Sequence, residues 1–186
     1  MGLRIIGGNL KGKKLHSIRG TMIRPSADRL RESLFNILSF RVQGSVVLDL
    51  FAGTGALGIE SLSRGAKFAV FVDKYQSAFS AIYRNIQSCA LSNKTKIIKW
   101  DIIKNLNCIK ANKPAFNLVL MDPPYNRNII NPALFNLHSS CSLKKGACIV
   151  VEHTVLEPIP KDRLEFTIAD QRRYGKTLVT FLDYMV

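Results

Sequence analysis

Residues 45–58 read SVVLDLFAGTGALG, and their pattern indicates the fold class of the chain. An apolar, β-branched run at residues 46–48 ends in Asp49 and a glycine-rich turn, and small residues follow from Ala56. This order predicts a buried parallel strand, a turn whose backbone can approach a ligand closely, and the N-terminus of a helix. The stretch therefore indicates a small-molecule site at the end of the first strand of an α/β sheet.

The rest of the chain continues to alternate strands with helices. Short apolar runs predict strands at residues 45–50, 67–72, 94–99, 116–121 and 147–151. Helices are predicted between them at residues 56–64, 77–89, 102–111 and 132–138. An amphipathic pattern predicts a further helix before the first strand, with an apolar face formed by Leu30, Leu34, Ile37 and Leu38. The pattern is typical of a mainly parallel sheet covered on both faces.

The two ends of the chain depart from this alternation. Residues 164–171 and 176–184 predict an antiparallel hairpin that closes the sheet. At the other end, the glycines of residues 7–8 lie between two basic segments, which predicts a small β-hairpin. We place a boundary near Gly44, with a basic N-terminal hairpin and helix at residues 1–43 and the main α/β domain at residues 44–186.

The charge of the chain favours a phosphate-bearing partner. The 186 residues include 27 Lys and Arg against 13 Asp and Glu, a net charge of +14. Residues 1–44 hold nine of the basic and two of the acidic side chains, which is half of the excess. Clustered Lys and Arg gain affinity for nucleic acids through counterion release. The alternative is a solvated basic surface without a partner.

Composition excludes several other classes of protein. A hydrophobic content of 47% fits a folded protein rather than a disordered one. No apolar run approaches the roughly 18 to 20 residues of a membrane span, and the four cysteines show no CxxC or metal-like spacing. We therefore expect a soluble, cytoplasmic monomer that interacts with no membrane and binds no metal.

The glycine turn leaves two cofactor classes open. Residues 53–58 match GxGxxG, and Asp73 lies 20 residues after Gly53, as in dinucleotide-binding sites. However, the chain has little room for a second mononucleotide-binding half, and Asp49 would repel a pyrophosphate. A carboxylate there suits S-adenosylmethionine, which carries an ammonium and a sulfonium. A short nicotinamide dehydrogenase remains the alternative.

Each predicted cofactor contact follows from its place after a strand. Asp49 would orient the turn and the methionine end of the cofactor, Asp73 would accept hydrogen bonds from the ribose, and Asp101 would accept one from the adenine amino group. For Asp73 and Asp101 the alternative is a helix N-cap. The predicted cofactor residues are Asp49, Phe51, Gly53, Thr54, Gly55, Asp73, Lys74, Asp101 and Ile102.

A second motif, residues 122–125 (DPPY), follows the fourth predicted strand. In an open α/β sheet the carboxyl ends of the strands form the ligand crevice, so this motif should face the glycine turn. If Asp122 and the Pro123 carbonyl each accept one N–H of a nucleobase amine, its lone pair can be aimed at a methyl group. Tyr125 would then stack on the base. We predict Asp122, Pro123, Pro124 and Tyr125 as the catalytic residues; the alternative is a proline-rich turn with a surface aromatic.

Several stretches together resemble one known family. DLFAGTG and DPPY are similar to the motifs of class I S-adenosylmethionine-dependent methyltransferases that act on amines. RIIGGNLKGKKL (residues 4–15), RPSADRLRESLFNIL (24–38) and RYGKTLVTFL (173–182) resemble the bacterial RsmD family. That family methylates the N2 amine of a guanine in the 16S ribosomal RNA of the small subunit.

This resemblance implies a Rossmann-like, mostly parallel seven-stranded sheet, S-adenosylmethionine as cofactor, and 16S rRNA within an assembling small subunit as partner. The basic N-terminal residues would position the RNA through its phosphates, and the candidates are Arg4, Lys11, Lys13, Lys14, Arg24 and Arg29. The family often carries phenylalanine where this chain has Tyr125, which makes the motif more like that of DNA adenine methyltransferases. An amino-methyltransferase acting on DNA adenine, on another nucleic-acid amine or on a protein amide, and a non-catalytic nucleic-acid-binding module, are the alternatives.

Overall fold

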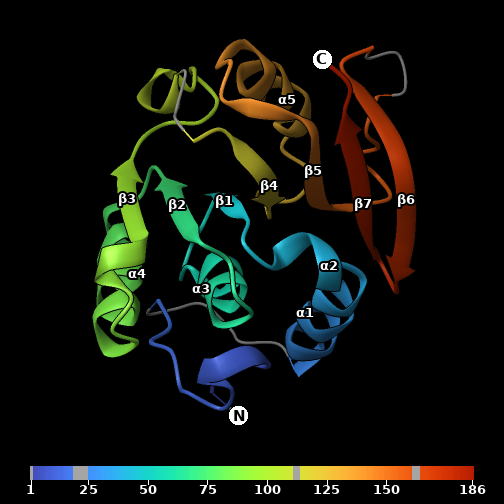
Figure 1. The fold of residues 1–186 in the computed structure, drawn as a ribbon. Coiled ribbons are helices and arrows are strands. Elements are labelled where there is room, and N and C mark those ends of the chain that lie inside the picture. The colour runs from blue at the N-terminus through green and yellow to red at the C-terminus, as the bar shows by residue number, and fades with distance from the viewer. Residues whose placement is uncertain (1, 19–24, 111–113, 161–163) are drawn as a thin grey trace.

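The computed structural model describes residues 2–18, 25–110, 114–160 and 164–186. Within these ranges seven strands form one sheet in the order β3-β2-β1-β4-β5-β7-β6 (Figure 1). The strands are β1 (Val46–Leu50), β2 (Phe68–Asp73), β3 (Thr95–Lys99), β4 (Phe116–Met121), β5 (Leu143–Thr154), β6 (Phe166–Tyr174) and β7 (Thr177–Tyr184). Strands β1 to β5 are parallel, and β7 pairs antiparallel with both β5 and β6. The predicted mainly parallel, seven-stranded sheet is confirmed.

Helices cover the sheet on both faces. The described helices are α1 (Pro25–Ile37), α2 (Ser39–Val42), α3 (Ala56–Ser63), α4 (Gln76–Ser88) and α5 (Ile130–Ser139), with short 3₁₀ turns η1 (Gly8–Leu10), η2 (Ser92–Lys94) and η3 (Asn107–Ile109). Apolar side chains of α1, α3 and α4 share one core cluster, and those of α5 and η3 share the cluster on the opposite face. No helix in the described ranges is both long and apolar enough to span a bilayer.

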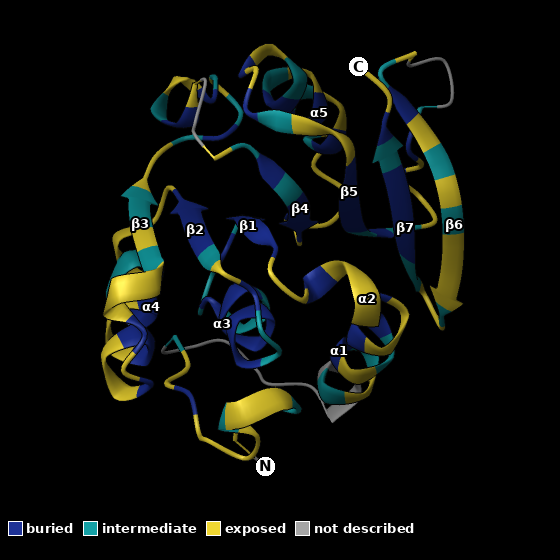
Figure 2. Ribbon diagram, viewed as in Figure 1, coloured by how far each residue is buried: buried dark blue, intermediate teal, exposed yellow. Residues whose placement is uncertain are grey.

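Strand β1, in the interior of the sheet, is buried on both faces (Figure 2). Val47 packs in the cluster with α3, whereas Leu48 packs in the cluster with α5, because successive side chains of a strand point to opposite faces. Burial on both faces explains why the strand is read as a continuous apolar run. Asp49 is the exception, and its burial needs a polar partner.

The predicted helix at residues 102–111 is wrong. Ile102, Leu106 and Ile109 are buried, but the backbone of residues 102–110 forms turns and the short η3 instead. Asp101 Oδ1 accepts the Ile103 N–H at 3.1 Å, and Asn136 Nδ2 donates to the carbonyls of Ile102 and Ile103, both at 2.9 Å. The Asp101 contact is one that a helix N-cap could also make, but Asn136 binds two carbonyls that a helix would have to pair with its own N–H groups.

The predicted N-terminal hairpin is not confirmed as a pair of strands. The N-terminal arm (residues 3–18) folds back through η1, and a single antiparallel bridge joins Arg4 to Lys14. The Ile5 N–H donates to the Lys13 carbonyl at 2.9 Å, and the Leu15 N–H donates to the Leu3 carbonyl at 2.8 Å. The arm therefore pairs with itself over a short length and packs on the α3 and α4 side, where its apolar residues join the core cluster of those helices.

The sheet order locates the ligand crevice. Strand β1 has β2 on one side and β4 on the other, so the chain reverses its direction of winding between β1 and β4. In doubly wound folds ligands bind at this switch point, outside the carboxyl ends of the strands. The glycine-rich turn follows β1, and the DPPY motif follows β4. The topology therefore brings both motifs to the same edge of the sheet.

Candidate active site

The turn after β1 is held in shape by left-handed backbone conformations and by Asp73. Gly53 and Gly55 have φ angles of 55° and 76°, which glycine adopts without strain. The Gly53 N–H donates to Asp73 Oδ2 at 2.9 Å, and the Tyr75 N–H donates to Asp73 Oδ1 at 3.0 Å. The Asp73 carboxylate thus ties the turn to the end of β2, and each of its oxygens retains a lone pair for a further donor.

Asp49 lies beneath this turn. Its side chain is fully buried, and its Oδ2 accepts the Gly58 N–H at 2.8 Å. Burial, and to a smaller extent the charge of Asp73, raises the pKa of Asp49 to about 8, although the Gly58 hydrogen bond acts in the opposite direction. Asp49 therefore positions the start of α3, and it is not among the residues that line the cavity described next.

A cavity of about 920 Å³ opens at the carboxyl ends of the strands. Its size is adequate for a nucleoside-sized ligand together with a base. Its wall is formed by Phe51, Asp73, Lys74, Tyr75, Trp100, Asp101, Ile102, Ile103, Asp122, Pro123, Pro124, Tyr125, Arg127 and Ile129. One cavity thus joins the acid at the end of β2 to the DPPY motif after β4. The glycine-turn residues Gly53, Thr54 and Gly55 lie beside this wall rather than in it.

The wall beyond Asp73 is formed by residues that follow β3. Asp101 is half-buried, and Ile102 is buried beside it. Trp100 also lines the cavity; its indole Nε1 donates to the Asn105 carbonyl at 3.0 Å, which fixes the ring. Sequence reasoning did not assign Trp100 a role, although an aromatic residue directly after a strand at this edge was an available signal.

Asp122 is exposed to the cavity, while protein surrounds it on its other sides. Burial, followed by the charges of Glu152 and Asp49, raises the pKa of Asp122 well above its ordinary value. Its carboxyl group therefore holds a proton more strongly than an ordinary surface aspartate does. A cationic ligand in the cavity would favour its ionised form.

Glu152 is a site residue that sequence reasoning missed. It lies on β5, and its Oε1 accepts a hydrogen bond from the Tyr125 hydroxyl. Burial, then this hydrogen bond and the charges of Glu152 and Asp122, raises the pKa of the Tyr125 phenol. The available signal was the same one that identified Asp73: an acid at the carboxyl end of an apolar strand.

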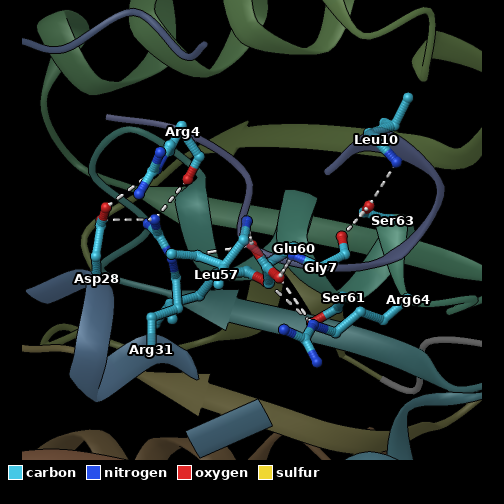
Figure 3. Close-up of polar contacts among 12 residues, drawn as sticks. Arg4, Gly7, Leu10, Asp28, Arg31, Leu57, Glu60, Ser61, Ser63 and Arg64 are labelled. Atoms are coloured by element: carbon cyan, nitrogen blue, oxygen red, sulfur yellow. Dashed lines mark hydrogen bonds and ion pairs between the residues drawn. The ribbon is translucent and has the colours of Figure 1, made fainter. Parts of the chain in front are cut away.

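The N-terminal arm is fixed to α3 by a buried carboxylate (Figure 3). Glu60 is fully buried and accepts the N–H groups of Ile6 and Gly7, both at 2.8 Å, and the Arg64 Nε–H at 2.8 Å. The Nε of the buried Arg31 lies 3.9 Å from Glu60 Oε2. Two backbone N–H groups and two guanidinium groups thus surround one carboxylate. Their interactions offset the free-energy cost of removing its charge from water.

Further hydrogen bonds extend this attachment along the arm. Ser63 accepts the Leu10 N–H at 2.9 Å and donates to the Gly7 carbonyl at 2.6 Å (Figure 3). At the other end, Asn85 pairs with the backbone of His16 and donates to the Thr54 carbonyl at 2.9 Å. Asn85 therefore links the arm directly to the glycine-rich turn.

The predicted RNA-binding residues do not gather at the cavity. Lys11, Lys13 and Lys14, which we call the arm lysines, are exposed near η1, and η1 contacts Ser63 at the end of α3 remote from the glycine turn. Arg4 is half-exposed and lies 3.6 Å from Asp28, and Arg29 is exposed. Arg24 lies outside the described residues. The arm lysines could contact a phosphate backbone only at a distance from the cavity.

The sheet order, the glycine turn after β1 and the cavity that joins it to the DPPY motif define an α/β methyltransferase fold. A methyltransferase structure from Escherichia coli superimposes with a TM-score of 0.85 and 27% identity, covering 100% of this chain and 99% of that one. Another methyltransferase structure, complexed with SAH, shares the fold with a TM-score of 0.64 at 14% identity over 87% of this chain and 50% of that one. Among the described residues, no group of His, Cys, Asp and Glu could hold a metal ion.

The chain belongs to the RsmD family, whose profile, described as Conserved hypothetical protein 95, matches residues 3–183. Ribosomal RNA small subunit methyltransferase D of Haemophilus influenzae is 34% identical over 160 residues, which cover 84% of this chain and 81% of that protein. The likeness thus extends over the arm, the α/β sheet and the closing hairpin.

Proposed function

We propose that the protein transfers a methyl group from S-adenosylmethionine to the exocyclic N2 amine of a guanine in the 16S rRNA of the small ribosomal subunit. The observation that carries this proposal is the single cavity lined both by Asp73 and by the DPPY motif. A donor bound at one end of such a cavity lies within reach of an amine bound at the other end. Small-subunit rRNA as substrate rests on the name of the Haemophilus relative, and the guanine N2 position rests on the family resemblance.

The residues at the β2 and β3 end of the cavity fit the cofactor. Both oxygens of Asp73 are oriented by backbone N–H groups, so their remaining lone pairs can accept from a ribose diol. Asp101 can accept from the adenine amino group, with Ile102 against the ring. When bound, S-adenosylmethionine supplies an electrophilic methyl group on a sulfonium. Asp49 serves the cofactor indirectly in this proposal, because it holds Gly58 and the start of α3 rather than the ligand.

The residues after β4 fit the amine. The two prolines restrict the backbone of the motif, which keeps the Pro123 carbonyl available as an acceptor. Asp122 can accept a second N–H, and it can take the proton that the nitrogen loses after methylation, since its pKa is raised. Tyr125 offers a ring on which the base can stack. Positioning and two acceptors then supply the chemistry without a histidine base.

An exocyclic guanine amine is buried by pairing and stacking inside a helix. The target nucleotide must therefore be unpaired or flipped into the cavity. Phosphate contacts by the exposed basic residues of the arm would supply affinity rather than base choice. In this proposal residues 1–43 act as the RNA-contacting extension and residues 44–186 as the methyltransferase domain.

The test measures methyl transfer from labelled S-adenosylmethionine to three substrates: naked 16S rRNA, immature small subunits and duplex DNA. Each is incubated with the parent protein, with Asp122→Ala, with Asp73→Ala, or with the control Glu32→Ala. We expect transfer to rRNA or to the subunit. Asp122→Ala should lower kcat by about two orders of magnitude or more and keep cofactor affinity within about tenfold. Asp73→Ala should lose cofactor binding by calorimetry. Glu32 is exposed on α1, so its replacement should match the parent.

Three outcomes would contradict the proposal. Transfer to DNA alone would favour adenine methylation. This is the competing function, because Tyr125 makes the DPPY motif similar to that of DNA adenine methyltransferases. A silent titration with S-adenosylmethionine for parent and Asp73→Ala alike would favour a non-catalytic binding module. Equal loss of cofactor binding and turnover in Asp122→Ala would assign that residue to the cofactor rather than to the amine. Mapping the methylated base in RNA from cells that lack the protein identifies the nucleotide.

A further inference from the structure

The loop that carries the DPPY motif is tied to β5 and to the turn after it at successive points. The Tyr125 hydroxyl donates to Glu152 Oε1, and the Thr154 hydroxyl donates to Asn126 Oδ1 at 2.6 Å. Glu157 accepts the backbone N–H groups of Arg127, Ile129 and Ile130 farther along the chain, at 3.2 Å, 2.9 Å and 3.4 Å. The Thr154 contact fixes a side chain outside the cavity wall, and the Glu157 contacts fix the backbone of Arg127 and Ile129, which line it. The Tyr125 contact fixes a ring that is part of the wall.

Glu152 has no contact of its own with the cavity. It lies near the carboxyl end of β5, where it pairs with Val179 of β7, and it does not line the wall. A half-buried carboxylate in a strand needs a donor, and the Tyr125 hydroxyl supplies it. Phenylalanine at position 125 could stack on a base equally well but could not be held in this way. The hydroxyl of Tyr125 and the carboxylate of Glu152 thus form a pair that the chemistry proposed above leaves without a role.

We infer that Glu152 is a positioning residue for the target base: its carboxylate holds the Tyr125 ring in the stacking orientation before the RNA arrives. This inference rests on the proposed function, because it concerns the ring that the flipped base would contact. A ring on an exposed loop is free to rotate about two side-chain torsions, and RNA binding would have to order it. Ordering such a side chain in advance raises affinity by about 2- to 12-fold.

The structure also offers a competing role for Glu152, through its charge. Its negative charge acts on Asp122, so it could tune the protonation of that carboxyl instead of holding the ring. The two roles separate on substitution by glutamine. The amide oxygen of glutamine still accepts the Tyr125 hydroxyl but carries no charge. The hydrogen bond that holds the Tyr125 ring, which we call the tether, is therefore retained in Glu152→Gln. An effect of the Glu152 charge on Asp122 is lost in the same variant.

The kinetic experiment compares Glu152→Ala, Glu152→Gln, Tyr125→Phe and the Glu152→Ala/Tyr125→Phe pair, with Glu32→Ala as control. We expect Glu152→Ala and Tyr125→Phe each to raise KM for RNA about 2- to 12-fold, with little change in kcat or in cofactor affinity. The pair should be no worse than Tyr125→Phe alone, because Tyr125→Phe already removes the hydrogen bond to Glu152 together with the contact of the hydroxyl with Thr177. Glu152→Gln should restore KM toward the parent value. An unchanged KM in Glu152→Ala, or an equal loss of kcat in Glu152→Gln and Glu152→Ala, overturns the inference.

A second measurement needs neither RNA nor cofactor. In protein with ¹³C-labelled tyrosine rings, the Tyr125 signal is the one that disappears in Tyr125→Phe. We expect relaxation measurements to show an ordered ring in the parent and in Glu152→Gln, and a more mobile ring in Glu152→Ala. Equal ring order in all three overturns the tether. If the parent transfers no methyl group to RNA, the proposed function fails, and the tether is still decided by this measurement.

Discussion

Glu60 offers the sharpest test of how the N-terminal arm is held. Its carboxylate accepts two backbone N–H groups of the arm and the Arg64 guanidinium, and it lies close to the buried Arg31. In Glu60→Gln one oxygen becomes an NH₂ group. If that group replaces Oε2, it faces the Ile6 N–H, so a hydrogen bond is lost and two donors are brought together. The Gly7 and Arg64 contacts of Oε1 can survive.

The size of the effect follows from this count. The lost Ile6 bond can be valued in two ways that are not added together: as a hydrogen bond to a charged group it contributes about 1.5–3 kcal/mol, and as an unpaired buried donor it costs about 1–3 kcal/mol. Loss of the charge also leaves Arg31 without its counter-charge on that side, where its Nε already has no hydrogen-bond partner. We expect Glu60→Gln to lower the free energy of unfolding by about 2–4 kcal/mol, and Glu60→Ala by about 3–5 kcal/mol, as when one partner of a buried ion pair is removed.

Urea unfolding measures the loss, and amide hydrogen exchange locates it. Exchange should accelerate first at Ile6 and Gly7, whose N–H groups lose their acceptor. Glu32→Gln is the matched control, since Glu32 is exposed on α1 and should stay within about 0.5 kcal/mol of the parent. A Glu60→Gln protein within 1 kcal/mol of the parent, with unchanged protection at both amides, would refute the reasoning.

Three further predictions concern the arm, the turn and the pH dependence of stability. Replacing the arm lysines together by glutamine should weaken RNA binding and reduce the slope of log K against log salt by about one per lost phosphate contact, measured by filter binding; an unchanged slope would assign them to packing. Gly58→Ala should cost about 1–3 kcal/mol in thermal unfolding, because its Cβ would lie 2.3 Å from the Phe71 ring, whereas Gly2→Ala, which meets nothing within 4 Å, should be neutral. Asp49 has an ordinary pKa of 3.8, raised to about 8 in the folded protein, so the unfolded chain ionises first and stability is lost as the pH rises from about 4 to 8. Asp49→Asn removes this dependence, so its free energy of unfolding, measured by urea titration, should rise relative to that of the parent as the pH increases from about 4 to 8. A difference between the two proteins that does not change with pH would contradict the argument that burial raises the pKa of Asp49.

Most of the sheet could be predicted because parallel strands that are buried on both faces have continuous apolar sequences. All seven predicted strands occur within a few residues of their expected positions, although β5 begins earlier than its apolar run. The chain order of strand, acid and turn also placed Asp73 and the DPPY motif at one edge, and the cavity joins them. These predictions needed only local periodicity and the topology of a parallel sheet.

The helix predicted from the apolar spacing of residues 102–111 is absent, because a side chain distant in sequence binds the backbone there. The apolar spacing of Ile102, Leu106 and Ile109 resembles a helix face, and all three are buried. The segment is nevertheless turned, because Asn136, more than 30 residues away, occupies its carbonyls. Propensity carries no information about such a partner, so the helix could not be excluded in advance.

Local patterns were sufficient to predict most of the order of strands and helices, the glycine turn, and the acids at the carboxyl ends of β1, β2 and β4, because each is a pattern within a few consecutive residues. Tertiary packing sets which acids line the cavity and which hold the fold. Asp49 is directed under the turn to Gly58, Glu60 to an arm more than 50 residues earlier, and Glu152 to Tyr125. The physical reason is that a carboxylate buried on folding must find donors, and packing rather than local sequence brings those donors within reach.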